Sequence, residues 1–198
     1  NSKTLPLSNS STKFTLSYIG VLEQLRNPEI LWETLNDLVQ ENADFKNDFQ
    51  LKFVGKLDDK ILQKIESSPL KNNLTNLGYQ THDVALKHMQ DSTVLLITNF
   101  PQESSKGIIP GKIFEYLATG KTILSFGPKD ADVEKILNET KSGKHFSYDE
   151  KENLKKFIIE SYENWKSGTL NQNAENIEQF SRKNLTQKLV DLMNENLF

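Results

Sequence analysis

Segments with the character of a β-strand alternate with segments of helical character along almost the whole chain. Strand-like runs of apolar and β-branched residues are expected at 13–20, 49–55, 74–78, 93–98, 121–126 and 144–148. Helical spacing of apolar residues is expected at 28–41, 58–65, 81–91, 110–119, 130–137, 151–166 and 173–196. Parallel strands need a crossover between them, which is usually a helix. The alternation therefore predicts an α/β fold: a doubly wound, Rossmann-like parallel sheet with helices on both faces.

The unit from residue 93 to residue 126 has the clearest local signals. Pro110 is expected at the first position of its helix, where its fixed φ is suitable and its missing N–H has no intrahelical partner to lose. Gly120 is expected to end the helix in the left-handed conformation. Lys112 and Glu115 fall on a different face from the apolar residues, and both are expected to point toward the mouth of the preceding loop.

Ligands of doubly wound sheets bind beyond the carboxyl ends of the strands, where the strand order reverses. With the usual order, the first and fourth strands are neighbours, so the loop at 20–26 faces the stretch at 99–112. The crevice between them is predicted to collect Gly20, Arg26, Lys106, Gly107, Gly111, Lys112 and Glu115.

These residue types suit a nucleoside diphosphate. Glycines let backbone N–H groups approach a phosphate closely, the N-terminal end of a helix attracts anions, and Arg or Lys supplies the counter-charge. A carboxylate such as that of Glu115 accepts hydrogen bonds from a vicinal diol. The alternative for Lys112 and Glu115 is a solvated helix face, which is the usual role of a Lys and a Glu three residues apart.

The stretch GIIPGKIFEYLATGKTIL at 107–124, together with the strand and loop before it, resembles the nucleotide-sugar-binding half of a GT-B glycosyltransferase, specifically the retaining family GT4. The shared pattern couples a Pro start, a Lys, an acidic residue and a Gly stop in one helix. The resemblance implies that Glu115 contacts the donor's ribose hydroxyls. Family members carry a second acidic residue, which contacts the donor sugar, eight positions earlier; this chain has Gly107 there. Glu103 would replace it only if the loop bends back.

Two further positions carry expectations from the same resemblance. Arg26 lies where family members usually have a pair of basic residues, and it is the one basic residue between Gly20 and Pro28. Tyr79 follows the third strand, where the family forms its nucleobase pocket. The alternative for Tyr79 is a position at the edge of the core.

The resemblance implies the C-terminal, donor-binding domain of a GT4-like glycosyltransferase (glycosyl transferases group 1). The whole enzyme would transfer a glycosyl group from a UDP- or GDP-sugar to a saccharide or lipid-linked acceptor in polysaccharide biosynthesis, with retained anomeric configuration. The acceptor-binding domain would precede this chain, so the chain alone is expected to be inactive. No catalytic residue is assigned within it.

The expected organisation is a linker at 1–12, the Rossmann-like nucleotide-sugar-binding domain at 13–170 and a C-terminal crossover helix at 171–198. The chain begins at Asn1 rather than at a methionine, and a polar run follows at 8–12. This start suggests either a cut at an interdomain linker or a processed N-terminus.

Composition limits the other functions. Of 198 residues, 36% are hydrophobic and 26% are charged, and the net charge of −3 gives no electrostatic reason to expect nucleic acid. The absence of cysteine excludes disulfides, thiolate zinc sites and a cysteine nucleophile. The three histidines have no metal-ligand spacing, so no metal and no cofactor are expected.

No apolar run is long enough to span a membrane and no signal peptide is visible. A cytoplasmic location is therefore expected, with any contact to the inner face of the membrane made by the missing domain.

Two other classes remain open. A nucleotide-sugar epimerase-like GT-B domain would share the donor fold but would show His and acidic residues in the crevice loops. A non-catalytic Rossmann-like binding module, such as a receiver-like domain, would show an acidic cluster at the ends of the first and third strands. The sequence shows neither feature, and it has no G-x-G-x-x-G, P-loop or Ser-His-Asp pattern.

Overall fold

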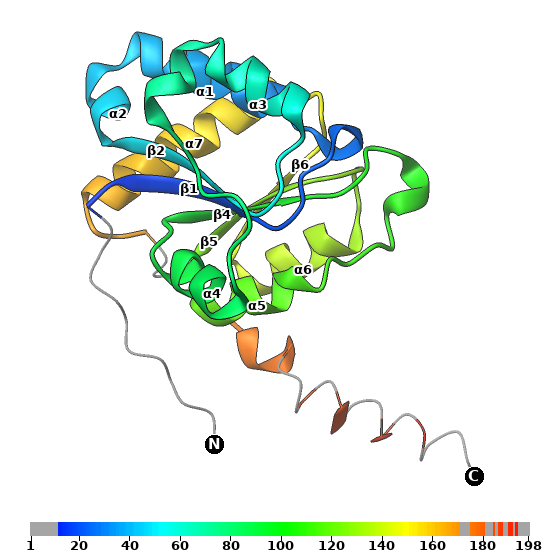
Figure 1. Ribbon diagram of the computed structural model, residues 1–198. Helices are drawn as coiled ribbons and strands as arrows, with labels where there is room; N and C mark the ends of the chain where they lie inside the picture. The colour runs from blue at the N-terminus through cyan, green and yellow to red at the C-terminus, as the bar shows by residue number, and fades with distance from the viewer. Residues whose placement is uncertain are drawn as a thin grey trace.

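The computed structural model describes residues 12–170, 175–180, 184, 186–187, 190–191 and 193. Its strands form one sheet in the order β3-β2-β1-β4-β5-β6, and every neighbouring pair is parallel (Figure 1). The strands are β1 Phe14–Ile19, β2 Phe49–Val54, β3 Leu74–Asn76, β4 Val94–Thr98, β5 Thr122–Phe126 and β6 Gly143–Phe146. This arrangement confirms the predicted doubly wound, Rossmann-like sheet.

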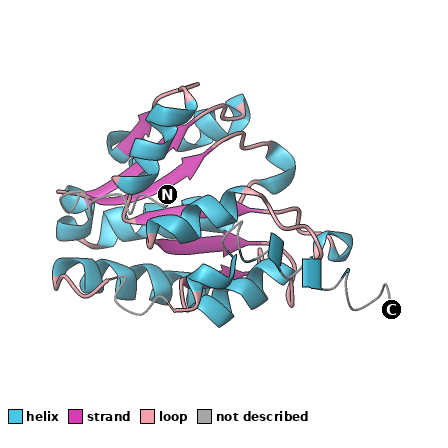
Figure 2. Cartoon of the chain, turned by 90° about the horizontal axis from the view of Figure 1, so that it is seen from below, coloured by secondary structure: helices cyan, strands magenta, loops and turns pink. Residues whose placement is uncertain are grey.

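Helices cover both faces of the sheet. One face packs against α1 Glu29–Glu41, α2 Ala43–Asp48, α3 Asp59–Glu66 and α7 Lys151–Lys166, and the other against α4 His82–Gln90, α5 Lys112–Thr119 and α6 Asp132–Thr140. Seen from below Figure 1, α4, α5 and α6 lie in front of the strands (Figure 2). The described 3-10 turns are η1 Gln24–Arg26, η2 Pro69–Asn73, η3 Glu103–Ser105 and η4 Ile177–Phe180.

Each face of the sheet has its own hydrophobic core, because successive side chains of a strand point to opposite faces. In β1, Tyr18 belongs to the core under α1 and α7, whereas Ile19 belongs to the core under α4, α5 and α6. Trp32 of α1 packs edge-on against Phe53 of β2, with ring centres 5.7 Å apart. Burying a Phe side chain contributes roughly 1.5–3 kcal/mol. Since Tyr18 and Phe53 lie near the carboxyl ends of their strands, this core supports the edge of the sheet where the crevice loops begin.

Some element boundaries differ from the predictions. The helix expected from Pro110 begins at Lys112, because Pro110 first forms a turn in which its carbonyl accepts from the N–H of Ile113 at 2.9 Å. Gly120 ends this helix at φ 66°, which confirms the predicted left-handed cap. The sequence did not predict α2, which begins at the side chain of Asn42, an acceptor for the N–H of Phe45 at 2.9 Å.

The predicted linker at 1–12 lies outside the described residues apart from Thr12, and much of the predicted crossover helix at 171–198 also does. In the described part, η4 is a 3-10 turn rather than an α-helix, and residues 184, 186–187, 190–191 and 193 are helical. The ring of Phe180 packs on that of Phe114 in α5, with centres 6.4 Å apart. The described helices include none with the length and apolar character needed to cross a bilayer.

Candidate functional site

The strand order reverses between β1 and β4, which are hydrogen-bonded neighbours as predicted. Leu16 pairs with Val94, and the register continues toward the carboxyl ends of both strands. The loops that follow, at 20–28 and 99–111, therefore leave the sheet beside each other (Figure 1). They define the crevice in which α/β sheets of this kind bind ligands.

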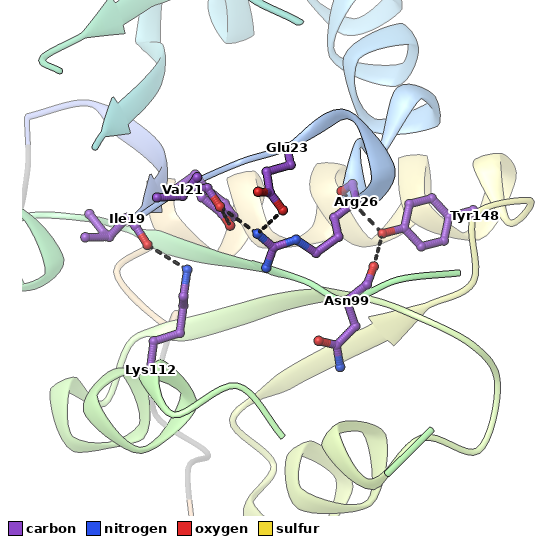
Figure 3. Close-up of polar contacts among 8 residues, drawn as sticks. Ile19, Val21, Glu23, Arg26, Asn99, Lys112 and Tyr148 are labelled. Carbon is purple, nitrogen blue, oxygen red and sulfur yellow. Dashed lines mark hydrogen bonds and ion pairs between the residues drawn. The ribbon is translucent and has the colours of Figure 1, made fainter. Parts of the chain in front are cut away.

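Lys112 projects from the first turn of α5 into this crevice (Figure 3). Its ammonium donates a hydrogen bond to the carbonyl oxygen of Ile19 at 2.7 Å and lies 4.4 Å from the ring centre of Tyr18. Burial, and to a smaller extent the charge of Arg26, lowers the pKa of Lys112 to about 8, although Glu115 acts in the opposite direction. An ammonium has three N–H donors, and one of them is used by Ile19. The protonated side chain is thus a cation at the place where the strand order reverses.

Two glycines shape the floor of the crevice. Gly20 has a φ of 122°, and a Cβ there would lie 2.9 Å from the Nζ of Lys112. Gly55, which follows β2, has a φ of 124°, and its Cβ would lie 2.1 Å from the carbonyl oxygen of Gly20. Both conformations are unfavourable for residues with a side chain. Glycine at these positions therefore lets the ends of β1 and β2 approach each other beneath Lys112.

Arg26 folds back over its own loop. Its Nη2 donates to the carbonyl of Val21 at 3.0 Å and to the carboxylate of Glu23 at 3.2 Å (Figure 3). The guanidinium carbon lies 5.5 Å from the ring centre of Phe100, which belongs to the loop after β4. Arg26 is therefore a second cation at the crevice and also a contact between its two loops.

Unpaired buried polar atoms gather at this edge of the sheet. Of the five buried side-chain atoms that lack a hydrogen-bond partner in the described residues, three are the Nε of Arg26, the Oγ1 of Thr98 and the hydroxyl of Tyr116. The Thr98 hydroxyl lies near that of Tyr18 but makes no hydrogen bond of ordinary geometry with it. The Tyr116 hydroxyl lies near the carbonyl of Ile19 but makes no hydrogen bond of ordinary geometry with it. An unpaired buried polar atom costs about 1–3 kcal/mol. Their concentration here is typical of a site that water or a ligand completes.

Lys106 pairs with carboxylates rather than with the residues around Lys112, and Gly107 lies near another carboxylate. The ammonium of Lys106 pairs with Glu103 at 2.7 Å and lies 4.0 Å from Asp130. A Cβ at Gly107 would lie 3.9 Å from the Oδ2 of Asp132. Glu103 is thus bound to Lys106, and the carboxylate beside position 107 is that of Asp132.

The remaining predicted residues differ in their surroundings. Glu115 is half-exposed and close enough to Lys112 to affect its pKa, and the described residues form no hydrogen bond or ion pair with its carboxylate. Gly111 has open space where a Cβ would lie. Tyr79 is 87% exposed, so it is not at the edge of the core, and its strand β3 is separated from β1 by β2. The structure therefore brings Gly20, Arg26, Lys112 and Glu115 together and leaves Tyr79 apart from them.

The described histidines do not form a metal site, since no group of three His, Asp or Glu side chains in the described residues is placed to hold a metal ion. His145 is buried at the end of β6, with its Nε2 3.0 Å from the carbonyl of Pro128 and its Nδ1 3.0 Å from the Oγ of Ser125. Nε2 donates to the carbonyl, so in the neutral ring Nδ1 accepts from the hydroxyl. Burial lowers the pKa of His145, which favours this neutral, structural form.

Sequence reasoning missed two residues of the crevice. Asn99 follows β4 directly, is buried, and donates from its side-chain amide to the carbonyl of Ile108 at 2.7 Å. Tyr148 follows β6, and its hydroxyl donates to the carbonyl of Asn99 and lies 3.3 Å from that of Arg26 (Figure 3). An Asn directly after a buried strand is a signal that could have identified Asn99. No local pattern marks Tyr148.

No family model matches this chain, and no curated protein sequence matches it. Solved structures do match. TarM is 18% identical, and the match covers 94% of this chain and 36% of TarM at a TM-score of 0.67; TarM from S. aureus has also been solved in a complex that contains UDP. HepE from Anabaena, in complex with UDP, is 17% identical over 93% of this chain and 49% of its own, with a TM-score of 0.71.

A third structure corresponds to a single domain. The C-terminal domain of LpcC, a glycosyl transferase group 1 family protein from Francisella tularensis, is 12% identical over 85% of each chain, with a TM-score of 0.61. At these identities the likeness shows the fold. The chain has the Rossmann-like architecture of a domain found in GT-B glycosyltransferases, and it spans 36% of the length of TarM and 49% of that of HepE.

Proposed function

We propose that this chain is the nucleotide-sugar-binding domain of a retaining, GT4-like glycosyltransferase. The observation that carries the proposal is the position of Lys112, a cation at the strand reversal beside Gly20 and Arg26. The likeness to HepE, which was solved with UDP, supports a nucleoside diphosphate as the anion. The Pro-Lys-Glu-Gly pattern at 110–120 supports the narrower family.

In this proposal the phosphates lie between Gly20 and the N-terminal end of α5. The dipole of the first turn of α5 attracts anions, and Lys112 and Arg26 neutralise the remaining charge. Lys112 keeps its hydrogen bond to Ile19 and offers its other donors to a phosphate oxygen. Glu115, three residues further along α5, accepts hydrogen bonds from the ribose hydroxyls.

The other predicted residues are proposed to contact further parts of the donor. Lys106 and Gly111 are assigned to the phosphates, Gly107 to the side of the donor sugar, and Tyr79 to the side of the nucleobase. The whole enzyme would transfer a glycosyl group from a UDP- or GDP-sugar to a saccharide or lipid-linked acceptor held by a second domain. Because positioning of both reactants is needed for transfer, this chain alone is expected to bind the donor without turning over an acceptor. A cytoplasmic location, with membrane contact only through the second domain, is part of the same proposal.

The proposal is tested by thermal unfolding with UDP, GDP and ADP at matched concentrations. A ligand that binds only the folded state adds about 2.7 kcal/mol at a hundredfold excess over Kd. For a domain of this size we expect the melting temperature to rise by roughly 5–11 °C. The nucleotide with the largest shift identifies the base. No shift with any of them at millimolar concentration would contradict a donor site.

Nucleotide affinity is expected to decrease as pH rises from 7.0 to 8.5. Lys112 has a pKa of about 8 in the free protein, so the fraction that carries a proton falls roughly fourfold over this range. A bound phosphate raises the pKa of Lys112, so binding is coupled to the uptake of a proton. This uptake becomes less favourable as pH rises. Calorimetric titration at four pH values measures this effect. The Lys112→Ala variant should bind more weakly and without this dependence; the same slope in that variant would mean that another group titrates.

A further inference from the structure

Tyr148 is the place where three loops at the crevice meet. It lies between β6 and α7, 49 residues along the chain from Asn99 and 122 from Arg26. Figure 3 shows its hydroxyl directed at the backbone of both residues, one in the loop after β4 and the other in the loop after β1. No other hydrogen bond between a side chain and both of these loops is found in the described residues.

The hydroxyl of Tyr148 has one proton and two carbonyl acceptors within reach. The shorter contact is to the carbonyl of Asn99, and that of Arg26 lies 3.3 Å away. Burial raises the pKa of Tyr148 well above its usual value, so the group stays protonated and remains a donor at every physiological pH. The hydroxyl can therefore donate to either carbonyl, and it holds the backbones of both loops close to one atom.

Further hydrogen bonds extend from this point into each loop. On one side, the side-chain amide of Asn99 donates to the carbonyl of Ile108 at 2.7 Å, close to the start of α5. On the other, the guanidinium of Arg26 donates to the carbonyl of Val21 at 3.0 Å, next to Gly20. The positions of the predicted phosphate-binding elements on both walls of the crevice thus depend on backbone atoms next to Tyr148.

The aromatic ring prevents the hydroxyl from simply following a loop that moves. It packs on Phe126 of β5, with ring centres 5.6 Å apart, and Phe126 is fully buried. The ring of Tyr148 is held by the sheet and its hydroxyl is bound to both loops. The side chain therefore fixes the distance from the sheet to each loop. The separation of the two loops therefore depends on the sheet rather than on either loop.

We propose that Tyr148 is a positioning residue of the donor crevice, which holds the loops after β1 and β4 at the separation that a nucleoside diphosphate requires. This inference rests on the proposed function. The alternative is a purely structural hydrogen bond, whose loss would lower stability without affecting the crevice.

The test uses Tyr148→Phe, which removes the hydroxyl and keeps the ring. Its matched control is Tyr162→Phe, because the hydroxyl of Tyr162 donates to Asp48 at 2.7 Å and its ring contacts Phe14 at the amino end of β1, away from the crevice. Amide hydrogen exchange in residues 20–28 and 99–111 reports the opening of the loops, and titration with the preferred nucleotide reports affinity. The amides of Arg26 and Ile108 are suitable probes, since each donates to a carbonyl of its own loop.

Loss of one neutral hydrogen bond changes an opening equilibrium by a factor of roughly 3 to 10. We expect exchange in both loops to accelerate by that factor in Tyr148→Phe. The Kd should rise, by at most that factor, because the apparent Kd depends on the fraction of molecules whose crevice is competent to bind. Tyr162→Phe should change neither. Exchange that accelerates in one loop alone, or an unchanged Kd, would overturn the positioning role. Failure of the wild-type chain to bind any nucleotide would instead refute the proposed function, and the inference with it, before any variant is compared.

Discussion

Replacing Gly55 with alanine is expected to lower the free energy of unfolding by about 3 kcal/mol or more. Its φ of 124° is unfavourable for a residue with a side chain, and the new Cβ would lie 2.1 Å from the carbonyl oxygen of Gly20, a backbone atom that no rotamer change can move. The N–H of Gly55 also donates to the carbonyl of Gly78 at 2.7 Å. Relief of the clash would therefore separate the ends of β1 and β2 and displace Gly20 from beneath Lys112.

Gly78→Ala is the matched control for this prediction. Gly78 also has a positive φ, 62°, but nothing lies within 4 Å of the position that a Cβ would take. Its loss should be limited to the strain of the left-handed conformation, about 1–2 kcal/mol. Denaturant unfolding followed by the fluorescence of Trp32 and Trp165 measures both variants. Equal losses would show that the close approach of Gly55 to Gly20 does not contribute.

The fold and the place of the candidate site could be predicted because both depend on local patterns. The alternation of strand and helix specifies a doubly wound sheet, and its usual strand order puts the loop after β1 beside the loop after β4. Lys112 could be assigned to this crevice from the strand order and from its place on the polar face of the helix that begins near Pro110. Its direction within the crevice could not, because the bond to Ile19 joins residues 93 positions apart.

Contacts between distant segments account for what was missed. Tyr148 reads as an ordinary aromatic residue after an edge strand, and its role depends on carbonyl groups that belong to two other loops. Gly55 reads as the end of a strand, and the backbone of Gly20 that makes it necessary follows a different strand. Tyr116 follows Glu115 directly but is fully buried, in the same hydrophobic core as Ile19 at the end of β1. Such pairings follow from the folded topology and not from the spacing of residues within one element.

The position of Lys112 also explains why a half-buried cation is tolerated without an ion pair. Its charge is offset by a carbonyl dipole and by the face of the Tyr18 ring, neither of which carries a full negative charge. The lowered pKa is the sign of that incomplete compensation. A phosphate would complete it, since a charge-assisted hydrogen bond is about twice as strong as a neutral one.

Glu115→Ala is expected to weaken binding of a ribonucleoside diphosphate by about ten- to more than a hundredfold, because a hydrogen bond to a charged group contributes roughly 1.5–3 kcal/mol. The Glu115 carboxylate is half-exposed and has no hydrogen bond or ion pair in the described part of the chain. Its loss should therefore leave the free energy of unfolding within about 0.5 kcal/mol of the wild-type value. A large effect on affinity with a small effect on stability would separate a ligand contact from a structural one.

The 2′-deoxynucleotide supplies the sharper comparison. If Glu115 accepts from both ribose hydroxyls, the deoxy ligand has already lost one of these bonds, and Glu115→Ala should weaken it much less than the ribo ligand. Lys112→Ala should weaken both ligands equally, because a phosphate contact does not depend on the sugar beyond it. Titration calorimetry of the wild type and both variants, each with the ribo and the deoxy ligand, measures these differences. Equal losses of affinity for the ribo and deoxy ligands in Glu115→Ala would mean that Glu115 lies on a solvated helix face and does not contact the ribose, whatever the result for Lys112→Ala.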